Sequence, residues 1–321
     1  MQTLFVGGTG FIGSHAQGEF TDHGHEVAVL SRSGGEDGAG VTHFEGDRDD
    51  RETLERVRDV VGPDVVVDFV GYHPAQVETA CEVFADSTYV FVSSASAYDM
   101  DPVQLPARED DPLEPCTPEQ AVDETMATYG ARKAECDRVC FAAAERGVDA
   151  RVVRPVLVYG PGDRSERHDY WLHRVATYDR VLVPGDGAAA FHRVYVEDLA
   201  AAIRTVAEDG AAGEAYNAAE RRTAWLDRSL ELAAEALDTE VEPVHVSARE
   251  LATVDLEPGD FPLYVPFPLV CSSAKLAALG WESTPLAETF TRTVAEHREA
   301  DRTGERFVDR AVEERLLDAL R

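Results

Sequence analysis

The chain has 321 residues, of which 44% are apolar, so it is long enough for one large domain or two smaller ones with a sizeable core. Its 61 acidic and 30 basic residues give a formal net charge of −31, which argues against nucleic acid or an anionic membrane as a partner. Only two basic residues are lysines, and the acidic residues are dispersed along the whole length. This composition indicates a halophilic protein, because molar salt shortens the Debye length to about 3 Å and screens the self-repulsion.

The five cysteines form no CxxC pair and have no histidine cluster beside them, so we predict neither a metal site nor a disulfide. The sequence has no stretch of 18 apolar residues. No charged-then-apolar leader precedes the first predicted strand. We therefore expect a cytoplasmic protein without a membrane segment.

In the first half of the chain, short apolar strands alternate with helical patterns. The predicted strands cover residues 3–8, 26–32, 41–47, 64–71, 88–96 and 150–160. The predicted helices cover residues 11–25, 48–62, a segment opening at Pro74, and 122–146. This alternation predicts an α/β fold with a Rossmann-type doubly wound parallel sheet. We expect the proline- and acid-rich segment 100–120 to be a loop, in a place where an active-site flap would lie.

After about residue 160 the elements become shorter, and amphipathic helices are predicted near residues 224–237, 285–299 and 305–320. This half predicts a smaller mixed C-terminal substrate domain. We place an NAD(P)-binding domain at residues 1–160, with later segments near 190–210 returning to it. Residues 161–321 then form mainly the substrate-binding domain.

The stretch GGTGFIGSH (7–15) places Gly7, Gly10 and Gly13 between the first strand and the first helix. Glycines at this spacing permit a tight turn and a close approach of backbone N–H groups to a pyrophosphate, which the helix N-terminus also attracts. The position directly after the first strand is the context that this motif requires. The sequence therefore predicts a dinucleotide site.

The end of the second strand carries Ser31 and Arg32, where an NAD site usually has an acidic residue. In so acidic a chain this absence favours NADP, with NAD as the alternative. After the third strand, Asp47 is placed either to accept from an adenine amino group or to cap a helix. The predicted cofactor-binding residues are Gly7, Gly10, Phe11, Ile12, Gly13, Ser31, Arg32, Asp47, Arg48 and Lys133.

The stretch YGARK (129–133) keeps one of the two lysines four residues after a tyrosine, so Tyr129 and Lys133 share a face of a predicted helix. A tyrosine hydroxyl is a poor base at pH 7 because its pKa is about 10. A nearby ammonium and a nicotinamide cation would stabilise the phenolate and lower that pKa. The compact ammonium of lysine can also reach ribose hydroxyls. The planar guanidinium of arginine cannot simply take the place of lysine in this role.

The chain resembles the extended short-chain dehydrogenase/reductase superfamily, in its NAD-dependent epimerase/dehydratase branch. The matching stretches are GGTGFIG (7–13), SSASAY (93–98), YGARK (129–133), RPVLVYGPGD (154–163) and VYVEDLA (194–200). Two further stretches, GYHPAQV (71–77) and YWLHRV (170–175), resemble a subgroup that includes relatives of chloroplast stem-loop RNA-binding proteins.

The resemblance implies that Ser94 hydrogen-bonds the reacting oxygen, that Tyr129 exchanges a proton with it, and that Lys133 holds the nicotinamide ribose. Family dehydratases place an Asp-Glu pair after the catalytic Ser/Thr, whereas this chain has Ala95 and Ser96, so we expect no dehydratase. Nucleotide-sugar enzymes usually carry an asparagine where this chain has Leu157, which puts such a substrate in doubt.

The sequence supports two hypotheses about function. The first is an NAD(P)-dependent oxidoreductase or epimerase acting on a hydroxyl or ketone carbon of a sugar, a nucleotide-sugar or a related small molecule. The second is a non-catalytic, dinucleotide-bound protein that binds RNA or senses redox state. The resemblance also implies a homodimer through helices near 74–86 and 122–146. The second half offers the side chains for an anion site, namely Arg164, Arg167, His168, His192 and Arg193, although each one singly is expected to be a solvated charge or a histidine at the edge of the core.

Overall fold

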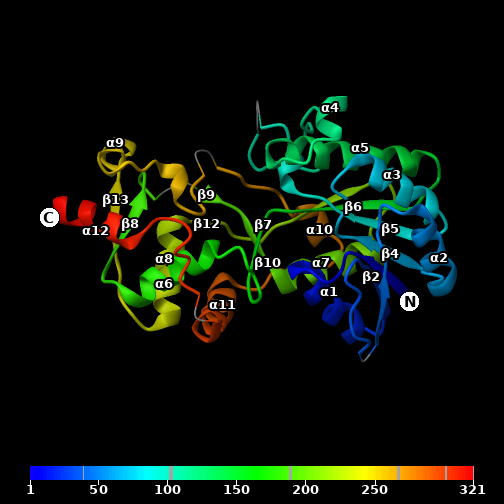
Figure 1. Ribbon diagram of the computed structural model, residues 1–321, viewed down its shortest axis with the longest axis horizontal. Coiled ribbons are helices and arrows are strands. Elements are labelled where there is room, and N and C mark those ends of the chain that lie inside the picture. The colour runs from blue at the N-terminus through cyan, green and yellow to red at the C-terminus, as the bar shows by residue number, and fades with distance from the viewer. Residues whose placement is uncertain (39, 101–103, 188–189, 266–267, 301, 321) are drawn as a thin grey trace. The chain divides into compact units, whose positions relative to one another are not determined.

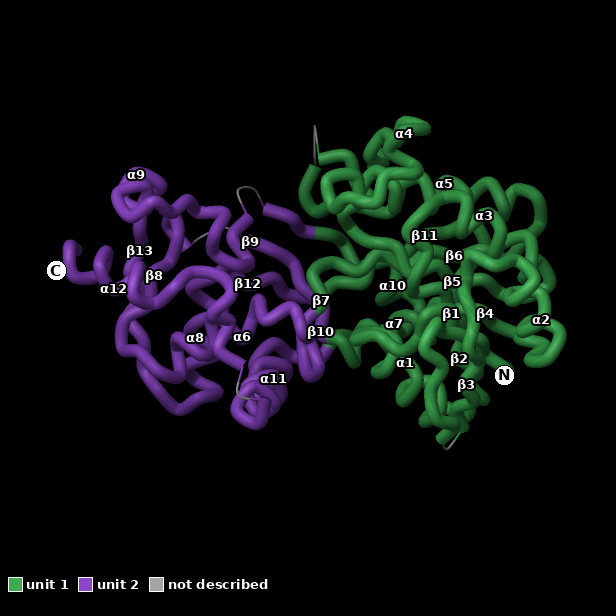
Figure 2. Tube along the Cα trace, in the orientation of Figure 1, with its two compact units in different colours: residues 1–158, 196–219, 271–283 green, residues 159–195, 220–270, 284–321 purple. Residues whose placement is uncertain are grey.

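The computed structural model describes residues 1–38, 40–100, 104–187, 190–265, 268–300 and 302–320. The chain divides into two compact units, which Figure 2 colours separately. Unit 1 contains Met1–Val158, Val196–Ala219 and Cys271–Ser283. Unit 2 contains Tyr159–Tyr195, Glu220–Val270 and Thr284–Arg321. The sequence prediction divided the chain at residue 160 and returned a segment near 190–210, but it did not assign residues 271–283 to the first domain.

Unit 1 is built on a parallel sheet. Within the described residues this sheet has seven strands in the order β11-β6-β5-β4-β1-β2-β3. The strands are β1 (Gln2–Val6), β2 (Glu26–Ser31), β3 (Val41–Glu45), β4 (Val65–Asp68), β5 (Thr88–Val92), β6 (Ala150–Pro155) and β11 (Ala215–Ala218). Strands such as β4, whose sequence VVVD is fully buried, are continuous apolar runs because helices cover both faces of the sheet. The prediction of a Rossmann-type doubly wound sheet is confirmed.

The strand order reverses beside β1, which pairs with β2 on one side and with β4 on the other. Val6 lies opposite Asp68 at the carboxyl end of this pair. In open α/β sheets, ligands bind in the crevice at such a reversal. The loops that follow β1 and β4 are therefore the place to look for a site.

Helices flank the sheet on both sides. In Figure 1, α3 and α5 lie on one side of the strands, and α1 and α7 lie on the other. The helices of unit 1 are α1 (Phe11–Asp22), α2 (Arg51–Val61), α3 (Pro74–Val83), α4 (Pro118–Ala121), α5 (Tyr129–Glu145), α7 (Val196–Asp209) and α10 (Ala274–Ala277), with 3₁₀ turns η1 (Ala95–Ala97) and η2 (Met126–Thr128).

The predicted helix 122–146 was wrong at its start, because α5 begins at Tyr129. The Asp123 carboxylate accepts hydrogen bonds from the hydroxyls of Thr125 (2.5 Å) and Thr128 (2.6 Å). Short polar side chains that bond locally in this way compete with helix formation, so the segment forms a turn and then η2. Tyr129 consequently lies in the first turn of its helix.

Two other predicted segments also differ from the structure. The predicted strand 150–160 is divided into β6 and β7 (Leu157–Tyr159). The predicted loop 100–120 contains α4 at its end, and its residues 101–103 lie outside the described part of the chain.

Unit 2 is a smaller mixed assembly in which β8 pairs in parallel with β13, and β9 pairs antiparallel with β12. Helix α8 packs against α6 and α11. The elements are α6 (Arg167–Thr177), β8 (Arg180–Pro184), β9 (Ala190–Phe191), β10 (Arg193–Tyr195), β12 (Ala224–Trp225), α8 (Leu226–Leu237), β13 (Glu242–Val246), α9 (Ala248–Leu251), η3 (Ala252–Val254), η4 (Pro258–Asp260), α11 (Leu286–Ala300) and α12 (Arg310–Ala319). In the described part of the chain, none of the helices has both the length and the apolar character needed to cross a membrane.

Candidate functional site

The glycine-rich loop after β1 has the geometry that its sequence predicts. Gly7 has φ +80°, and a Cβ there would lie 2.4 Å from the Val70 side chain, so the loops after β1 and β4 touch. A Cβ at Gly13 would lie 2.4 Å from the carbonyl oxygen of Gly8, so α1 packs directly on the loop. At Gly10, by contrast, a Cβ would meet nothing within 4 Å. The loop thus leaves open space at the N-terminus of α1, which fits a phosphate group.

The other residues predicted to bind the cofactor near β1 and β2 include Phe11, Ile12, Ser31 and Arg32, and their contact with a nucleotide stays a prediction. Phe11 and Ile12 are half-buried in the first turn of α1, which has no acidic residue. At the end of β2, the Ser31 hydroxyl donates to the Gly34 carbonyl at 3.0 Å and shapes the turn. The adjacent Arg32 is exposed, so its guanidinium can reach an anionic ligand.

Asp47 and Arg48 have clear contacts within the chain. Asp47 is exposed and accepts from the Asp49 N–H at 3.0 Å, while the residue that caps α2 is Asp50. Arg48 is buried, and its Nη2 lies 3.0 Å from the Asp68 carboxylate. Burial is the largest single effect and would lower the pKa of Arg48, but Asp68 and other nearby acidic groups together outweigh it and raise the pKa. Arg48 therefore braces the end of β4, and its direct contact with a nucleotide stays a prediction.

The structure brings Ser94 and Tyr129 together. Ser94 follows β5 in extended conformation, and its hydroxyl accepts from the Ser96 N–H at 3.1 Å. Its side chain is also near enough to Tyr129 to act on the pKa of the Tyr129 hydroxyl. Gly130 permits this approach, because a Cβ there would lie 2.4 Å from the Ser96 carbonyl oxygen. Helix α5 thus begins in direct contact with the turn that follows β5.

Lys133 lies one helical turn further along α5 and is 2% exposed. Its ammonium donates to the carbonyl oxygens of Gly71 (3.0 Å) and Val92 (2.9 Å), at the carboxyl ends of β4 and β5. Its Nζ is 5.9 Å from the centre of the Tyr129 ring. The three predicted catalytic side chains therefore lie in one cluster of unit 1.

The electrostatics of this cluster disfavour the charged forms of both Tyr129 and Lys133. Burial raises the pKa of Tyr129 to about 12, and the nearby Ser94 side chain offsets only part of that effect. Burial also lowers the pKa of Lys133, against the attraction of nearby groups that include Cys136 and Asp68. Without a further positive charge, Tyr129 is a poor base at neutral pH.

Sequence reasoning missed three residues of the cluster, namely Tyr72, Gly130 and Arg132. The buried Arg132 guanidinium donates to the carbonyls of Tyr72 (3.1 Å) and Thr125 (2.8 Å), so it joins the loop after β4 to the turn before α5. The stretch GYHP, which contains Tyr72, is the sequence signal that points to this part of the cluster.

The comparison with family models decides the classification. The model described as "NAD dependent epimerase/dehydratase family" matches residues 3–219, which include the glycine loop, Ser94, Tyr129 and Lys133. The chain belongs to this family.

Two curated proteins are similar to this family member. Chloroplast stem-loop binding protein of 41 kDa b from Arabidopsis thaliana is 26% identical over 77% of this chain and 66% of its own length. Low-salt glycan biosynthesis protein Agl12 from Haloferax volcanii is 27% identical over 88% of this chain and 93% of its own length. The chain thus spans slightly less than two thirds of the chloroplast protein and nearly all of the archaeal one.

Solved structures have the same fold. The structure of RMD from Pseudomonas aeruginosa, complexed with NADPH, superposes with a TM-score of 0.70 at 18% identity. The superposition covers 94% of this chain and 100% of that one.

A buried network fixes the face of α5 that carries Asp137. Asp137 accepts from Arg154 Nε at 2.7 Å, and both side chains are fully buried. Arg154 also donates to the Tyr98 hydroxyl at 3.0 Å, which in turn donates to Asn217 at 2.7 Å. These bonds join α5, β6, β11 and the η1 turn, so they make the base of the cluster rigid.

The arginine and histidine residues considered for an anion site have other contacts. Arg193 is fully buried and donates to Ser229 Oγ at 2.7 Å, with the ring centre of Phe191 4.5 Å from its guanidinium carbon. His168 stacks on Tyr159 at 4.8 Å, and burial holds its pKa well below the ordinary value. These two residues therefore belong to the core of unit 2, whereas Arg164 is exposed.

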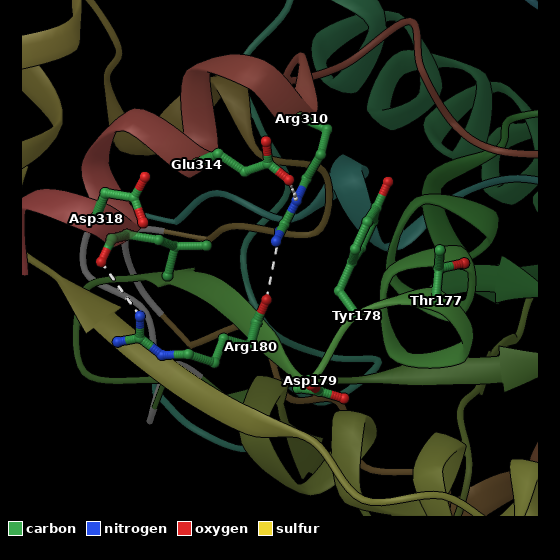
Figure 3. A pocket seen from close by; sticks show the side chains of 8 residues that line it. Thr177, Tyr178, Asp179, Arg180, Arg310, Glu314 and Asp318 are labelled. Atoms are coloured by element: carbon green, nitrogen blue, oxygen red, sulfur yellow. Dashed lines mark hydrogen bonds and ion pairs between the residues drawn. The ribbon is translucent and has the colours of Figure 1, made fainter. Parts of the chain in front are cut away.

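Unit 2 has a pocket of about 320 Å³ between the α6–β8 connection and α12. Figure 3 shows the side chains that line it. Arg310 donates to the Arg180 carbonyl at 3.3 Å and lies over the ring of Tyr178. Arg180 donates to the Leu317 carbonyl at 3.2 Å. The cations of this pocket attach α12 to β8, and none of the predicted site residues lines it.

Proposed function

We propose that this chain is an NAD(P)-dependent oxidoreductase or epimerase that acts on a hydroxyl or ketone carbon of a sugar, a nucleotide-sugar or a related small molecule. The observation that carries the proposal is the cluster of Ser94, Tyr129 and Lys133 at the carboxyl ends of β4 and β5. Membership of the NAD-dependent epimerase/dehydratase family supports it.

Each residue of the cluster has one role in this proposal. Tyr129 takes a proton from the substrate hydroxyl or returns one to its carbonyl oxygen, and Ser94 donates a hydrogen bond to the same oxygen. Lys133 adds positive charge that favours the Tyr129 phenolate. A bound nicotinamide would supply the hydride acceptor or donor and, when oxidised, a second positive charge.

We propose NADP as the cofactor, with NAD as the alternative. The support is local, because β2 ends in the buried Ser31 followed by the exposed Arg32, and no carboxylate stands at these two positions. An arginine at this place suits a 2′-phosphate, whereas an acidic residue suits the free ribose hydroxyls.

We propose that the reaction is not a dehydration. Elimination of water needs an acid and a base next to the reacting carbon. The residues that follow Ser94 are Ala95, which is buried, and Ser96, which is exposed and has no carboxylate. Leu157, in place of an asparagine, favours a substrate other than a nucleotide-sugar.

Epimerisation and net reduction make different demands on the cofactor. An epimerase oxidises and re-reduces one substrate, so it gains nothing by releasing its nucleotide. A reductase must exchange the nucleotide in every turnover. A nucleotide that stays bound through purification therefore favours the epimerase.

Replacing Tyr129 by phenylalanine tests the proposal. Once a carbonyl screen with NADPH and NADH has given a substrate, we expect Tyr129→Phe to lower turnover by about 10²- to 10⁴-fold, the usual contribution of acid-base catalysis. Its affinity for NADPH should stay within a few-fold of the parent. The matched control is Tyr178→Phe in unit 2, which should keep full turnover. Undiminished turnover in Tyr129→Phe would rule Tyr129 out as the proton-transfer group.

The second candidate is a non-catalytic, dinucleotide-bound protein that binds RNA or senses redox state. The similarity to the chloroplast stem-loop binding protein favours it. The net charge of −31 counts against it, because RNA binding draws on a basic surface. Binding of a stem-loop RNA that weakens as salt rises, together with no turnover on any carbonyl compound, would favour this candidate.

We also propose a cytoplasmic homodimer from a halophile. The expected interface lies on α3 and α5, which pack against each other in unit 1. Light scattering in high salt should give the mass of two chains.

A further inference from the structure

The environment of the Lys133 ammonium is unusual for a buried cation. Both of its hydrogen-bond acceptors are neutral backbone carbonyls, of Gly71 and Val92. Asp68 and Asp137 act on it through charge rather than through a hydrogen bond. A buried ammonium without a bonded carboxylate needs other stabilisation, because loss of water penalises the charged form.

Aromatic rings surround the ammonium. Its Nζ lies 4.5 Å from the ring centre of Phe91, 5.2 Å from that of Tyr72 and 5.9 Å from that of Tyr129. All three distances fall within the range of about 6 Å in which a ring face attracts a cation. We call these three side chains the aromatic enclosure of Lys133.

Tyr72 differs from the other two rings because it is 46% exposed, whereas Phe91 is fully buried in β5. The backbone of Tyr72 is nevertheless fixed. Its N–H donates to Gln76 Oε1 at 2.9 Å, and its carbonyl accepts from Arg132 at 3.1 Å. Core packing does not explain an exposed ring on a fixed backbone, whereas a position over the ammonium does.

We propose that Tyr72 is a positioning residue whose ring closes the open side of the aromatic enclosure and keeps the Lys133 ammonium charged beside Tyr129. This inference rests on the proposed function, because Tyr72 acts through Lys133 on the proton-transfer group. The ring face matters in this role, and the phenolic hydroxyl does not.

Other groups that face Lys133 also affect the charge of its ammonium, in addition to the Tyr72 ring. Cys136 and Asp137 lie on α5 itself, Asp68 ends β4, and Arg48 follows β3. All four of these groups are present in every Tyr72 variant. A change in the titration of Lys133 between two Tyr72 variants therefore reports the ring itself.

The chain offers a direct measurement, because Lys133 and Lys275 are its only lysines. Protein labelled with ¹³C at the lysine ε-carbon gives two NMR signals, and Lys275→Arg assigns them. Tyr72→Phe keeps the ring face, whereas Tyr72→Leu removes it but still excludes water. We expect the Lys133 titration midpoint in Tyr72→Leu to fall about 0.5 to 1 pH unit below that in Tyr72→Phe, as expected for loss of one cation–π contact.

Lys275 serves as an internal control, since it pairs with Glu214 and lies over the Tyr216 ring, so its midpoint should not move. Equal Lys133 midpoints in Tyr72→Phe and Tyr72→Leu would overturn the proposal. The measurement needs neither nucleotide nor substrate, so its failure is separate from that of the proposed function. If the midpoint shifts while Tyr129→Phe keeps full turnover, the enclosure stands and the proposed role of Tyr129 in proton transfer fails.

Discussion

At the residue scale, the state of Tyr129 depends on what is bound near it. Burial raises its pKa to about 12, so the nucleotide-free protein holds Tyr129 protonated at neutral pH. An oxidised nicotinamide would bring a positive charge, and such a charge favours the phenolate. In the proposed function, nucleotide binding therefore prepares the base as well as the hydride acceptor.

Gly130 is the residue on which the approach of Tyr129 to Ser94 depends most directly. A Cβ at Gly130 would meet the backbone oxygen of Ser96 at 2.4 Å, so Gly130→Ala must push α5 away from the η1 turn. We expect this variant to lose about 1–3 kcal/mol of unfolding free energy, although alanine is the better helix former. Urea unfolding at constant high salt measures the change.

The matched control is Gly18→Ala in α1, where a Cβ would meet nothing within 4 Å. That substitution should stabilise the protein by about 0.5–1 kcal/mol, as expected for an open helical position. If Gly130→Ala gained stability as Gly18→Ala does, the close contact between α5 and the η1 turn would be refuted.

At the element scale, the sequence pattern predicted those features that depend on residues close together in the sequence. The strands of the sheet follow from continuous apolar runs, and the glycine loop follows from spacing that only a turn between β1 and α1 explains. The start of α5 was mispredicted because its turn depends on one side chain, Asp123, which bonds two threonines. The spacing of apolar residues and the helix propensity of each residue do not contain that information.

The parts of the site that sequence reasoning missed come from contacts between distant segments. Tyr72 and Arg132 are 60 residues apart, yet the Arg132 guanidinium binds the Tyr72 carbonyl. Arg48 was assigned to the cofactor from its place after β3, but its burial against Asp68 depends on how β3 and β4 lie in the folded sheet. Such contacts appear only once the elements are packed.

At the scale of the whole molecule, the charge of −31 dominates the behaviour of the folded state. Repulsion among dispersed carboxylates destabilises a compact chain, and salt reduces that repulsion. We expect the midpoint of thermal unfolding to rise by roughly 10 °C or more between about 0.1 M and several molar KCl.

Sucrose at matched osmolality separates screening from general exclusion of solutes, and we expect it to raise the midpoint less than KCl does. A midpoint that stayed constant or fell as KCl increased would contradict adaptation to high salt.

The central claim is that unit 1 holds a nicotinamide dinucleotide at the loop after β1. Calorimetric titration of the nucleotide-stripped protein with NADPH and NADH in high salt tests it most directly. We predict one nucleotide per chain, tighter binding of NADPH than of NADH, and loss of binding in Gly13→Val, since even a Cβ at Gly13 would collide with the Gly8 carbonyl. Absence of binding by either nucleotide to the folded parent protein would contradict the account.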